Sequence, residues 1–363
     1  MTFILFILMI GVLITFHELG HMLAAKVFNV YVKEFAVGFG PKLLSHQGKE
    51  TLYTLRAIPF GGYTAMVDEN KLDEENENSD EETTKSEAFT IEEERTFYGV
   101  SALKRIVILL SGPIFNFLLA MVIFISIFSA VGVKAIYPKA IIEQVIENSP
   151  AQSAGLMVED EIIAITYANN EKVEIKTTYD VAVNNSLHKG AYTLTVLRGN
   201  ETIDILVEPV YDEKSKSYLI GIVFSGETEF QKLKGPEAIV EGIKHTFESA
   251  ILTFKSVISI FTGNIGLENV SGIVGMYSIT EEALSYSLMS YFSLVASISI
   301  SLCVMNLIPI PIFDGGRILM TIIEVIIGKR DEKIESIVLT ISMFLVLALF
   351  ILITISDIGK LFR

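Results

Sequence analysis

The sequence predicts an α-helical polytopic membrane protein with four transmembrane helices, a membrane-associated β-hairpin region and one inserted β-rich domain. Hydrophobic residues make up 51% of the 363 residues, and the mean hydropathy is +0.51. Both values are too apolar for an ordinary soluble protein. Four segments are long enough to cross about 30 Å of hydrocarbon, which takes about 20 apolar residues in a helix. They lie near residues 2–27, 106–133, 286–305 and 334–355.

The first apolar segment carries three ionisable side chains, in the motif His17-Glu18-Leu19-Gly20-His21. A charge near the bilayer centre costs about 2.5–3.5 kcal/mol on insertion scales, so these side chains need a function. Helical residues four apart share a face, so His17 and His21 can bind one Zn²⁺ while Glu18 stays free as a base. The alternative is a chance match with packing histidines. The lipid-like residues on both sides of the motif favour the metal site.

The region 29–67 alternates short apolar runs with turn residues, at 35–41, 51–55 and 58–63. Its glycines and prolines exclude a second long helix, and the spacing predicts small strands and hairpins. Irregular backbone at membrane depth is tolerated only where it pairs with protein or lines a cavity. Any part of this region at that depth therefore needs protein partners.

The net charge of −15 is concentrated in one segment. Between residues 68 and 94 there are thirteen Asp or Glu against Lys71 and Lys85, a balance of −11. Such a run is typical of a solvated, disordered insertion. The sequence has no basic patch to support nucleic-acid binding. The single cysteine, Cys303, lies in the third span, so the chain has no disulfide framework.

The composition becomes that of a soluble domain over residues 134–228, with five strand-like runs and one helix near 179–187. This pattern resembles a bacterial, circularly permuted PDZ domain, a fold that binds a peptide as an added edge strand. Further on, apolar residues at helical spacing over 238–261 predict an amphipathic helix at the membrane surface. The five runs are 140–146, 161–165, 192–197, 202–207 and 219–224.

A catalytic zinc normally has three protein ligands, so a third donor is needed beside the two histidines. The candidate is Asp314, which follows the third span and the helix-breaking Pro309 and Pro311. We expect the prolines to unwind the chain, and Gly315 and Gly316 to let it turn sharply and direct the carboxylate into the bundle. The alternative is an ordinary turn aspartate at the membrane surface. The motif on the first span favours the ligand.

The second span contains two further interruptions. Pro113 is expected near the start of its helix, where a proline costs little. Asn116 is a polar side chain in an otherwise lipid-like helix. Two interpretations of Asn116 stay open, a hydrogen bond between helices or a place in the polar site.

Taken together, these motifs resemble the site-2 protease family of intramembrane zinc metalloproteases, specifically the bacterial regulators of sigma factors that contain a PDZ domain. The likeness covers nearly the whole chain, and the order of its motifs is more specific than any one of them. Besides the PDZ-like insert, the motifs lie at 17–21, 39–41, 59–63, 112–116, 271–275 and 306–315.

The resemblance implies that His17, His21 and Asp314 bind zinc and that Glu18 is the catalytic base. It also implies that Asn306 holds the unwound backbone of the substrate, and that the region 29–67 lies against the membrane and pairs with the substrate as a strand. The remaining positions that the resemblance assigns to substrate binding are Pro309, Pro311, Gly61, Gly62 and Tyr63, with Asn116 in a supporting role.

The implied activity is regulated intramembrane proteolysis of single-span proteins, such as anti-sigma factors or signal-peptide remnants, after a first cut elsewhere. The expected partners are these substrates, membrane lipid, and peptide termini at the PDZ-like domain. Two competing hypotheses use the same residues differently: a membrane transporter for metal ions or protons, and an inactive scaffold that displays the PDZ-like domain.

Lysine and arginine near the span ends indicate that the loops after spans one and three are cytoplasmic and that the PDZ-like domain is extracytoplasmic. The resemblance implies that the membrane is the plasma membrane of a bacterium. The chain then divides into eight parts. They are the first transmembrane helix at 1–28, the β region at 29–67, the acidic insertion at 68–98, the second transmembrane helix at 99–133, the PDZ-like domain at 134–228, a linker with the amphipathic helix at 229–285, the third transmembrane helix with the Asp314 motif at 286–317, and a short helix with the fourth transmembrane helix at 318–363.

Overall fold

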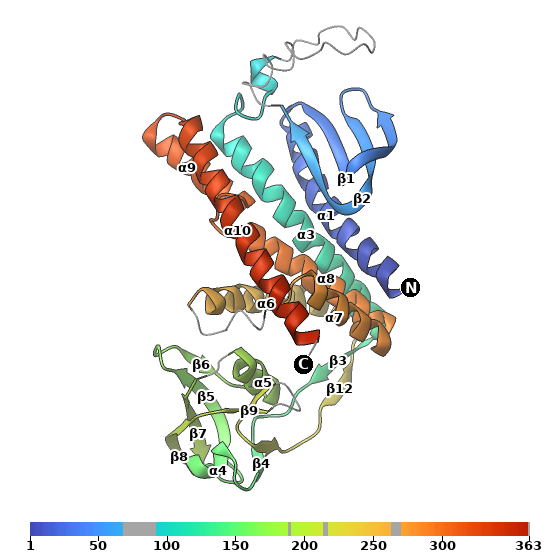
Figure 1. The fold of residues 1–363 in the computed structure, drawn as a ribbon. Coiled ribbons are helices and arrows are strands. Elements are labelled where there is room, and N and C mark those ends of the chain that lie inside the picture. Colours follow the sequence, from blue (N-terminus) through green and yellow to red (C-terminus); the bar gives the residue numbers. More distant parts are fainter. Residues whose placement is uncertain (68–91, 188–189, 213–216, 263–269, 362–363) are drawn as a thin grey trace. The chain divides into compact units, whose positions relative to one another are not determined.

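The computed structural model describes residues 1–67, 92–187, 190–212, 217–262 and 270–361. The chain forms two compact units (Figure 1). The helical unit contains residues 1–127, 240–253 and 270–363, and the β unit contains residues 128–239 and 254–269. Most of the predicted acidic insertion, residues 68–91, lies outside the described residues. A short 3-10 helix, η1 (Glu93–Arg95), follows it.

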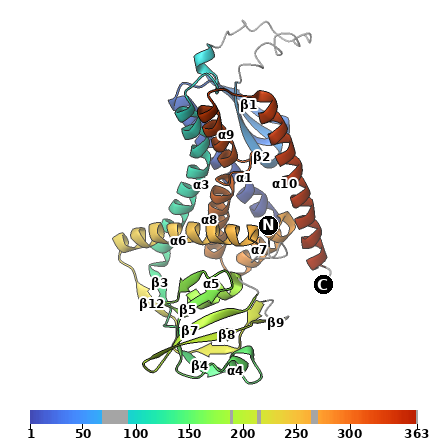
Figure 2. The same cartoon turned by 90° about the vertical axis from the view of Figure 1, so that its left-hand side faces the viewer.

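The four predicted spans are helices that are long and apolar enough to cross a membrane. They are α1 (Thr2–Val27), α3 (Ala102–Val131), α8 (Leu288–Asn306) and α10 (Glu332–Leu361). Figures 1 and 2 show α1, α3 and α8 running beside one another. Their core joins Phe6, Met9 and Leu13 of α1 to Tyr291 and Val295 of α8.

Helices α1 and α3 pack closely against each other at two glycines. A Cβ atom on Gly20 of α1 would overlap the backbone carbonyl of Ser111, and one on Gly112 of α3 would overlap the rings of His17 and His21. This crossing therefore brings the α3 backbone directly against the HELGH motif.

The expectation that Pro113 lies near a helix start is wrong, because Pro113 lies well inside α3. The helix begins before the apolar segment because Arg105, in its first turns, is buried against Glu324. Its guanidinium makes two hydrogen bonds to the Glu324 carboxylate, at 2.7 and 2.8 Å. Because the Glu324 carboxylate neutralises its charge, Arg105 can lie in the helix, although that charge had suggested that this position belongs to the preceding loop.

The region after α1 forms two long strands, β1 (Val32–Gln47) and β2 (Leu52–Met66), in place of several short hairpins. Both strands bend near their middle, where Gly38, Gly40 and Gly61 have positive φ angles. The bends fold each strand into two segments, which gives a sheet of four segments.

The segment 32–37 lies inside this sheet, between 61–66 and 52–56. It pairs with 61–66 in antiparallel register, beginning with Val32 opposite Met66. Its residues pair with 52–56 in the same chain direction, as in parallel strands. The segment 42–47 pairs with 52–56 on the far side. The two edges of the sheet, within the described residues, are therefore 61–66 and 42–47.

Three further helices complete the helical unit. The predicted amphipathic helix is α6 (Gly235–Phe261), whose residues 240–253 belong to this unit. Helix α7 (Ile273–Tyr286) was not expected within the predicted linker. It begins where the Asp357 carboxylate accepts hydrogen bonds from the backbone N–H groups of Gly272 and Gly275, at 2.7 and 2.9 Å. Such a long-range cap is invisible in a local pattern.

The expected sharp turn at Gly315 and Gly316 is also wrong, because both glycines lie in the first turn of α9 (Asp314–Ile327). A Cβ atom on either glycine would overlap the backbone of residues 307–311, the connection from α8. The glycines therefore permit close packing of α9 against this connection, which holds Asp314 at the helix start.

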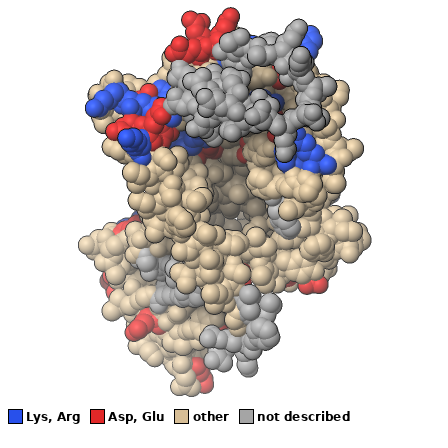
Figure 3. All heavy atoms as spheres, turned by 45° about the horizontal axis from the view of Figure 1, so that its top comes forward, with Lys and Arg blue, Asp and Glu red and all other residues tan. Residues whose placement is uncertain are grey.

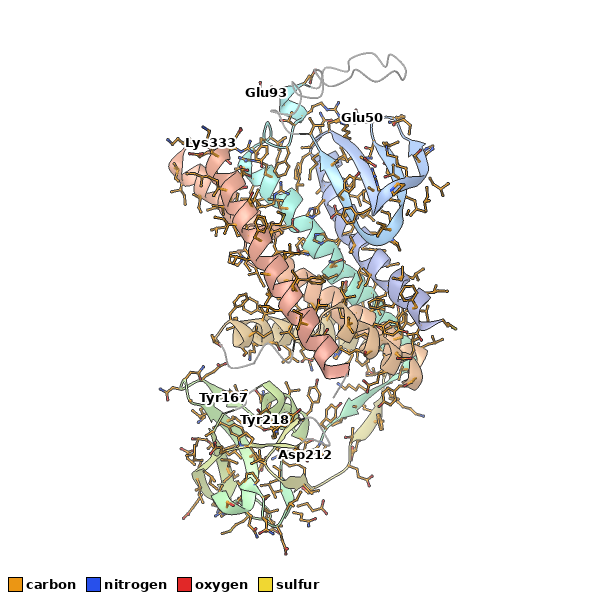
Figure 4. The ribbon with its side chains drawn as sticks, in the orientation of Figure 1. Glu50, Glu93, Tyr167, Asp212, Tyr218 and Lys333 are labelled. Atoms are coloured by element: carbon orange, nitrogen blue, oxygen red, sulfur yellow. The ribbon has the colours of Figure 1, made fainter. Side chains whose placement is uncertain are left out.

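The β unit is built around a four-stranded antiparallel sheet in the order β6, β5, β7, β8. Its core contains Ile162, Ile165, Tyr192, Leu194 and Val196. Figure 4 labels Tyr167 on β5, beside α5. The elements are β3 (Val133–Ile136), β4 (Ile142–Val145), α4 (Pro150–Ala154), β5 (Glu161–Tyr167), β6 (Lys172–Glu174), α5 (Thr178–Leu187), β7 (Tyr192–Arg198), β8 (Glu201–Val207), β9 (Val210–Asp212), β10 (Ser217–Leu219), β11 (Ile222–Phe224) and β12 (Glu229–Lys232).

All five predicted strand runs and the predicted helix correspond to elements of the β unit. The boundary at 228 is wrong by one strand, because β12 (Glu229–Lys232) pairs with β3 (Val133–Ile136). The assignment to the PDZ fold stays a prediction.

A buried ion pair in the β unit should make it sensitive to acid. Asp160 is fully buried and accepts hydrogen bonds from Arg198 Nε at 2.7 Å and from the Met157 N–H at 2.9 Å. Burial raises the pKa of the Asp160 carboxyl, but these bonds and the Arg198 charge more than offset it, so the pKa lies below its usual value. The stabilisation is present above the unfolded pKa of about 4 and is lost as pH falls through the lower folded value.

Hydrogen exchange of peptides from 157–198, measured relative to the intrinsic exchange rate at each pH, should therefore stay slow from pH 7 to about pH 5 and accelerate below about pH 4. Asp160→Asn should accelerate it already at pH 7. Glu161→Gln, which removes a partner of the exposed Lys139, is the matched control and should change little. Equal exchange in both variants would contradict this prediction.

Candidate functional site

His17, His21 and Asp314 converge between α1 and the start of α9. The Asp314 Oδ2 atom lies 3.2 Å from His17 Nε2 and 3.3 Å from His21 Nε2, and the two nitrogens are 3.2 Å apart. Ligands about 2.0–2.1 Å from a tetrahedral zinc are separated by about 3.3 Å. The triangle therefore has the size of one face of a zinc tetrahedron.

The ring of His21 is held by a backbone carbonyl of the neighbouring helix. Its Nδ1 lies 2.8 Å from the carbonyl oxygen of Ile108 in α3, in a buried position. Because a carbonyl can only accept, Nδ1 carries the hydrogen and Nε2 of the neutral ring presents a lone pair. That lone pair points toward the same place as Asp314 Oδ2.

The donor set fits a metal cation. Asp314 Oδ2 is buried and accepts no hydrogen bond from the described residues. A carboxylate oxygen and imidazole lone pairs within about 3.3 Å of one another repel unless a cation lies among them. Two imidazole nitrogens and one carboxylate oxygen are a ligand set of catalytic zinc, which leaves one position for the reacting molecules.

Asn116 of α3 contacts His17 of α1, a contact that fits both alternatives left open by the sequence, a hydrogen bond between helices and a place in the polar site. Its side chain is fully buried, and its Nδ2 lies 3.4 Å from His17 Nδ1. Its Oδ1 is buried and has no partner among the described residues. A half-turn of the amide places Oδ1 against His17 Nδ1, where it accepts the Nδ1 hydrogen and leaves Nε2 free for the metal.

Replacing Asn116 by alanine should lower the zinc affinity about 10- to 100-fold, as expected for the outer partner of a metal-binding histidine. Competition titration with a zinc chelator measures this affinity. Ser299→Ala is the matched control, because the Ser299 hydroxyl donates to the backbone carbonyl of Asn116 in the same buried place without touching His17. An unchanged affinity in Asn116→Ala would exclude the proposed contact.

The site opens into a cavity of about 380 Å³. Glu18 lies on its wall beside the two histidines, and the edge segment 61–66 forms another wall. The Thr64 hydroxyl donates a 2.9 Å hydrogen bond to the backbone carbonyl of Glu18, which joins this segment to α1. The lining residues are His17, Glu18, His21, Tyr63, Thr64, Met66, Leu109, Asn306, Ile312, Asp314 and Arg317.

Most of the residues that the sequence assigned to this site line the cavity. Asn116, Gly61, Gly62, Pro309 and Pro311 do not; Asn116 lies in α3, the glycines in β2 and the prolines in the connection between α8 and α9. Asn306, at the end of α8, lines the cavity, and its amide makes no hydrogen bond within the described part of the chain.

Sequence reasoning missed several contributors to the site. Arg317 follows Asp314 by one helical turn, a spacing that would have placed it on the same face of α9. Thr64 directly follows Tyr63, which the sequence assigned to the site, so its hydroxyl could have been considered as a further candidate. The carbonyl of Ile108 carries no sequence signal, because every residue has one.

Comparisons with known proteins identify a family and several similar sequences. The model of peptidase family M50 matches residues 5–349. A Clostridium acetobutylicum protein named as a zinc metalloprotease is 36% identical over 360 residues, which cover 97% of this chain and 96% of that protein. A Clostridium perfringens protein with the same description is 32% identical, covering 97% of each chain. The protease Eep of Enterococcus faecalis is 31% identical, covering 99% of each.

Proposed function

Because this chain belongs to peptidase family M50, the site-2 protease family of zinc metalloproteases, we propose that it cuts single-span membrane proteins within the bilayer. The observation that carries this proposal is the cavity in which His17, Glu18, His21 and Asp314 meet segment 61–66, an edge of the β-sheet whose outer side no other described strand pairs with. Such an edge suits an endopeptidase, because an extended substrate can pair with it while its carbonyls face the catalytic groups.

In the proposed reaction His17, His21 and Asp314 hold the metal, and Glu18 is the general base. When bound, zinc supplies Lewis-acid chemistry that makes a water molecule acidic near neutral pH and polarises a carbonyl. The Glu18 carboxylate accepts the proton of the attacking water and later delivers it to the leaving amine. Asn306, whose amide is unpaired within the described residues, binds the substrate backbone.

A transmembrane substrate must unwind before it can be cut, because its carbonyls are hydrogen-bonded within the helix. Pairing with the edge 61–66 replaces the lost bonds. Gly61, Gly62 and Tyr63 would then form the strand that meets the substrate, while Pro309 and Pro311 shape the connection that carries Asn306 and Asp314. The substrates would be anti-sigma factors, signal-peptide remnants or similar proteins, released by a prior cut.

The proposed location is the bacterial plasma membrane, with the loops after spans one and three in the cytoplasm and the PDZ-like domain outside. Figure 4 shows Glu50, Glu93 and Lys333 at the same end of the helical unit, as this arrangement requires. Figure 3 shows that charged side chains gather at that end. We propose that the PDZ-like domain binds peptide termini and that lipid surrounds the four spans.

The test uses the purified protein in detergent with a single-span substrate, either complete or trimmed on its outer side. Mass spectrometry of the products locates the cut. We expect cleavage within the apolar span, faster for the trimmed substrate, lost with a zinc chelator and restored by added zinc. Cuts confined to the soluble parts of the substrate would contradict intramembrane proteolysis.

The edge 61–66 offers a second test. Ala65→Pro should reduce cleavage at least about tenfold, because proline cannot donate a backbone hydrogen bond and disturbs strand pairing. Leu44→Pro, on the opposite edge 42–47, is the matched control and should reduce it far less. Equal activity of the two variants, both with full zinc content, would exclude substrate pairing at this edge.

A further inference from the structure

A polar network crosses three neighbouring segments of the sheet beside the active-site cavity. Glu34, on the inner segment 32–37, accepts hydrogen bonds at Oε1 from Thr54 Oγ1 at 2.6 Å and from Arg56 Nη2 at 2.8 Å. Its Oε2 accepts a bond from the Tyr63 hydroxyl at 2.9 Å. Arg56 Nη2 also donates to the Tyr63 oxygen at 2.6 Å, and Nη1 donates to the Gly40 carbonyl at 2.8 Å.

This network is mostly removed from solvent. The side chains of Glu34 and Arg56 are 15% and 17% exposed, and Arg56 Nε is buried with no hydrogen-bond partner among the described residues. Desolvating such an ion pair offsets most of its attraction, so a buried pair is weak evidence for stability. Its best-attested use is to fix one structural register against alternatives. The segments of this sheet need such a device, because a slip of one residue turns every side chain to the other face.

The network acts on the strand that lines the catalytic cavity. Tyr63 contributes its hydroxyl to the network and lies on the cavity wall. The next residue, Thr64, is bonded to the backbone of Glu18. The ring of Phe39 stacks on the ring of Tyr63 at a centroid distance of 6.2 Å. The edge 61–66 is thus fixed to α1 at one residue and to the rest of the sheet at the preceding one.

We propose that Glu34 and Arg56 are positioning residues that set which peptide bond is cut. They hold the edge 61–66 in one register relative to Glu18, and the substrate strand that pairs with this edge takes its own register from it. This inference rests on the proposed pairing of substrate with the edge. Neither residue lines the cavity, so neither touches the reacting atoms.

Loosening the network should broaden the choice of bond. Because side chains alternate along a strand, the accessible alternative is a slip of two residues, which preserves the faces. Glu34→Gln and Arg56→Met should therefore yield products cut two residues away from the original bond. The specificity constant kcat/KM at the original bond should fall at least about tenfold, since small displacements of reacting groups have large effects.

The experiment measures the fraction of product cut at each bond by mass spectrometry, together with kcat, KM and zinc content. Arg56→Lys retains the charge with fewer hydrogen bonds and should restore part of the original bond choice. Tyr53→Phe, on the same sheet, is the matched control: it removes the 2.6 Å hydrogen bond that Lys26 of α1 donates to the Tyr53 hydroxyl, and Tyr53 does not line the cavity. It should cut the original bond alone, as the wild type does.

The possible outcomes are distinguishable. New products at two-residue spacing, with zinc content unchanged, support the inference. If Glu34→Gln and Arg56→Met cut only the original bond, whatever their cleavage rate, the network has no part in bond choice. The inference is then wrong while the proposed function stands. If the wild type cuts no membrane substrate, the proposed function fails and the inference fails with it.

Discussion

Replacing Glu18 by glutamine is expected to lower kcat about 10²- to 10⁴-fold, the contribution typical of a general base. The amide has nearly the same shape as the carboxylate but cannot accept the proton of the attacking water. The variant should keep its zinc, because Glu18 is not one of the three converging ligands. Single-turnover cleavage of the trimmed substrate measures the rate, and mass spectrometry measures the metal.

The matched control for Glu18 is Glu50→Gln. Glu50 pairs with Arg95 and lies at the end of the helical unit, away from the cavity (Figure 4). Its replacement should leave the rate unchanged. A Glu18→Gln enzyme that keeps its zinc and cuts at the wild-type rate would remove Glu18 as the base and would require another proton acceptor.

Removing a proposed ligand should have a different effect, the loss of zinc itself. We expect His21→Ala and Asp314→Ala each to lower the zinc affinity by more than the roughly 10- to 100-fold assigned to an outer partner. In either variant the two remaining ligands cannot complete the metal site alone. Their buried donor atoms would also lose the cation that compensates them. Activity should fall with zinc occupancy and recover partly at high zinc concentration.

His46→Ala is the control for nonspecific binding, because His46 is exposed on β1 and does not belong to the converging group. Its zinc affinity should equal that of the wild type. Full zinc content in Asp314→Ala would show that the third ligand is a different residue.

The chemistry of this site is readable from sequence where it depends on local spacing. His17 and His21 lie four residues apart in an apolar run, and a helix places them on one face. Asp314 could be chosen because few other carboxylates follow a span directly. In both cases the physical constraint, the cost of an idle charge near lipid, acts on a single segment.

The features that the sequence could not reveal depend on contacts between distant segments. Asn116 reaches His17 only because Gly20 and Gly112 let α1 and α3 cross closely. The start of α3 depends on Glu324 of α9, which neutralises Arg105. A local pattern carries no information about such partners.

The sheet of β1 and β2 illustrates the same limit. Turn residues predicted small strands and hairpins, whereas the glycines at 38, 40 and 61 bend two long strands, and the pattern could not say which segments pair. The same-direction pairing of 32–37 with 52–56 was not anticipated, since neighbouring runs were expected to form simple hairpins. This pairing is what leaves 61–66 as an edge beside the catalytic cavity.

X-ray absorption at the zinc edge of the purified wild-type protein tests the central claim most directly, that His17, His21 and Asp314 hold the metal. The spectrum should show one zinc per chain with two imidazole nitrogens at about 2.0–2.1 Å and carboxylate or water oxygens at about 2.0–2.2 Å. Asp314→Ala should lose oxygen scattering or the metal itself. A sulfur neighbour at about 2.3 Å, or a spectrum unchanged by Asp314→Ala, would contradict the account.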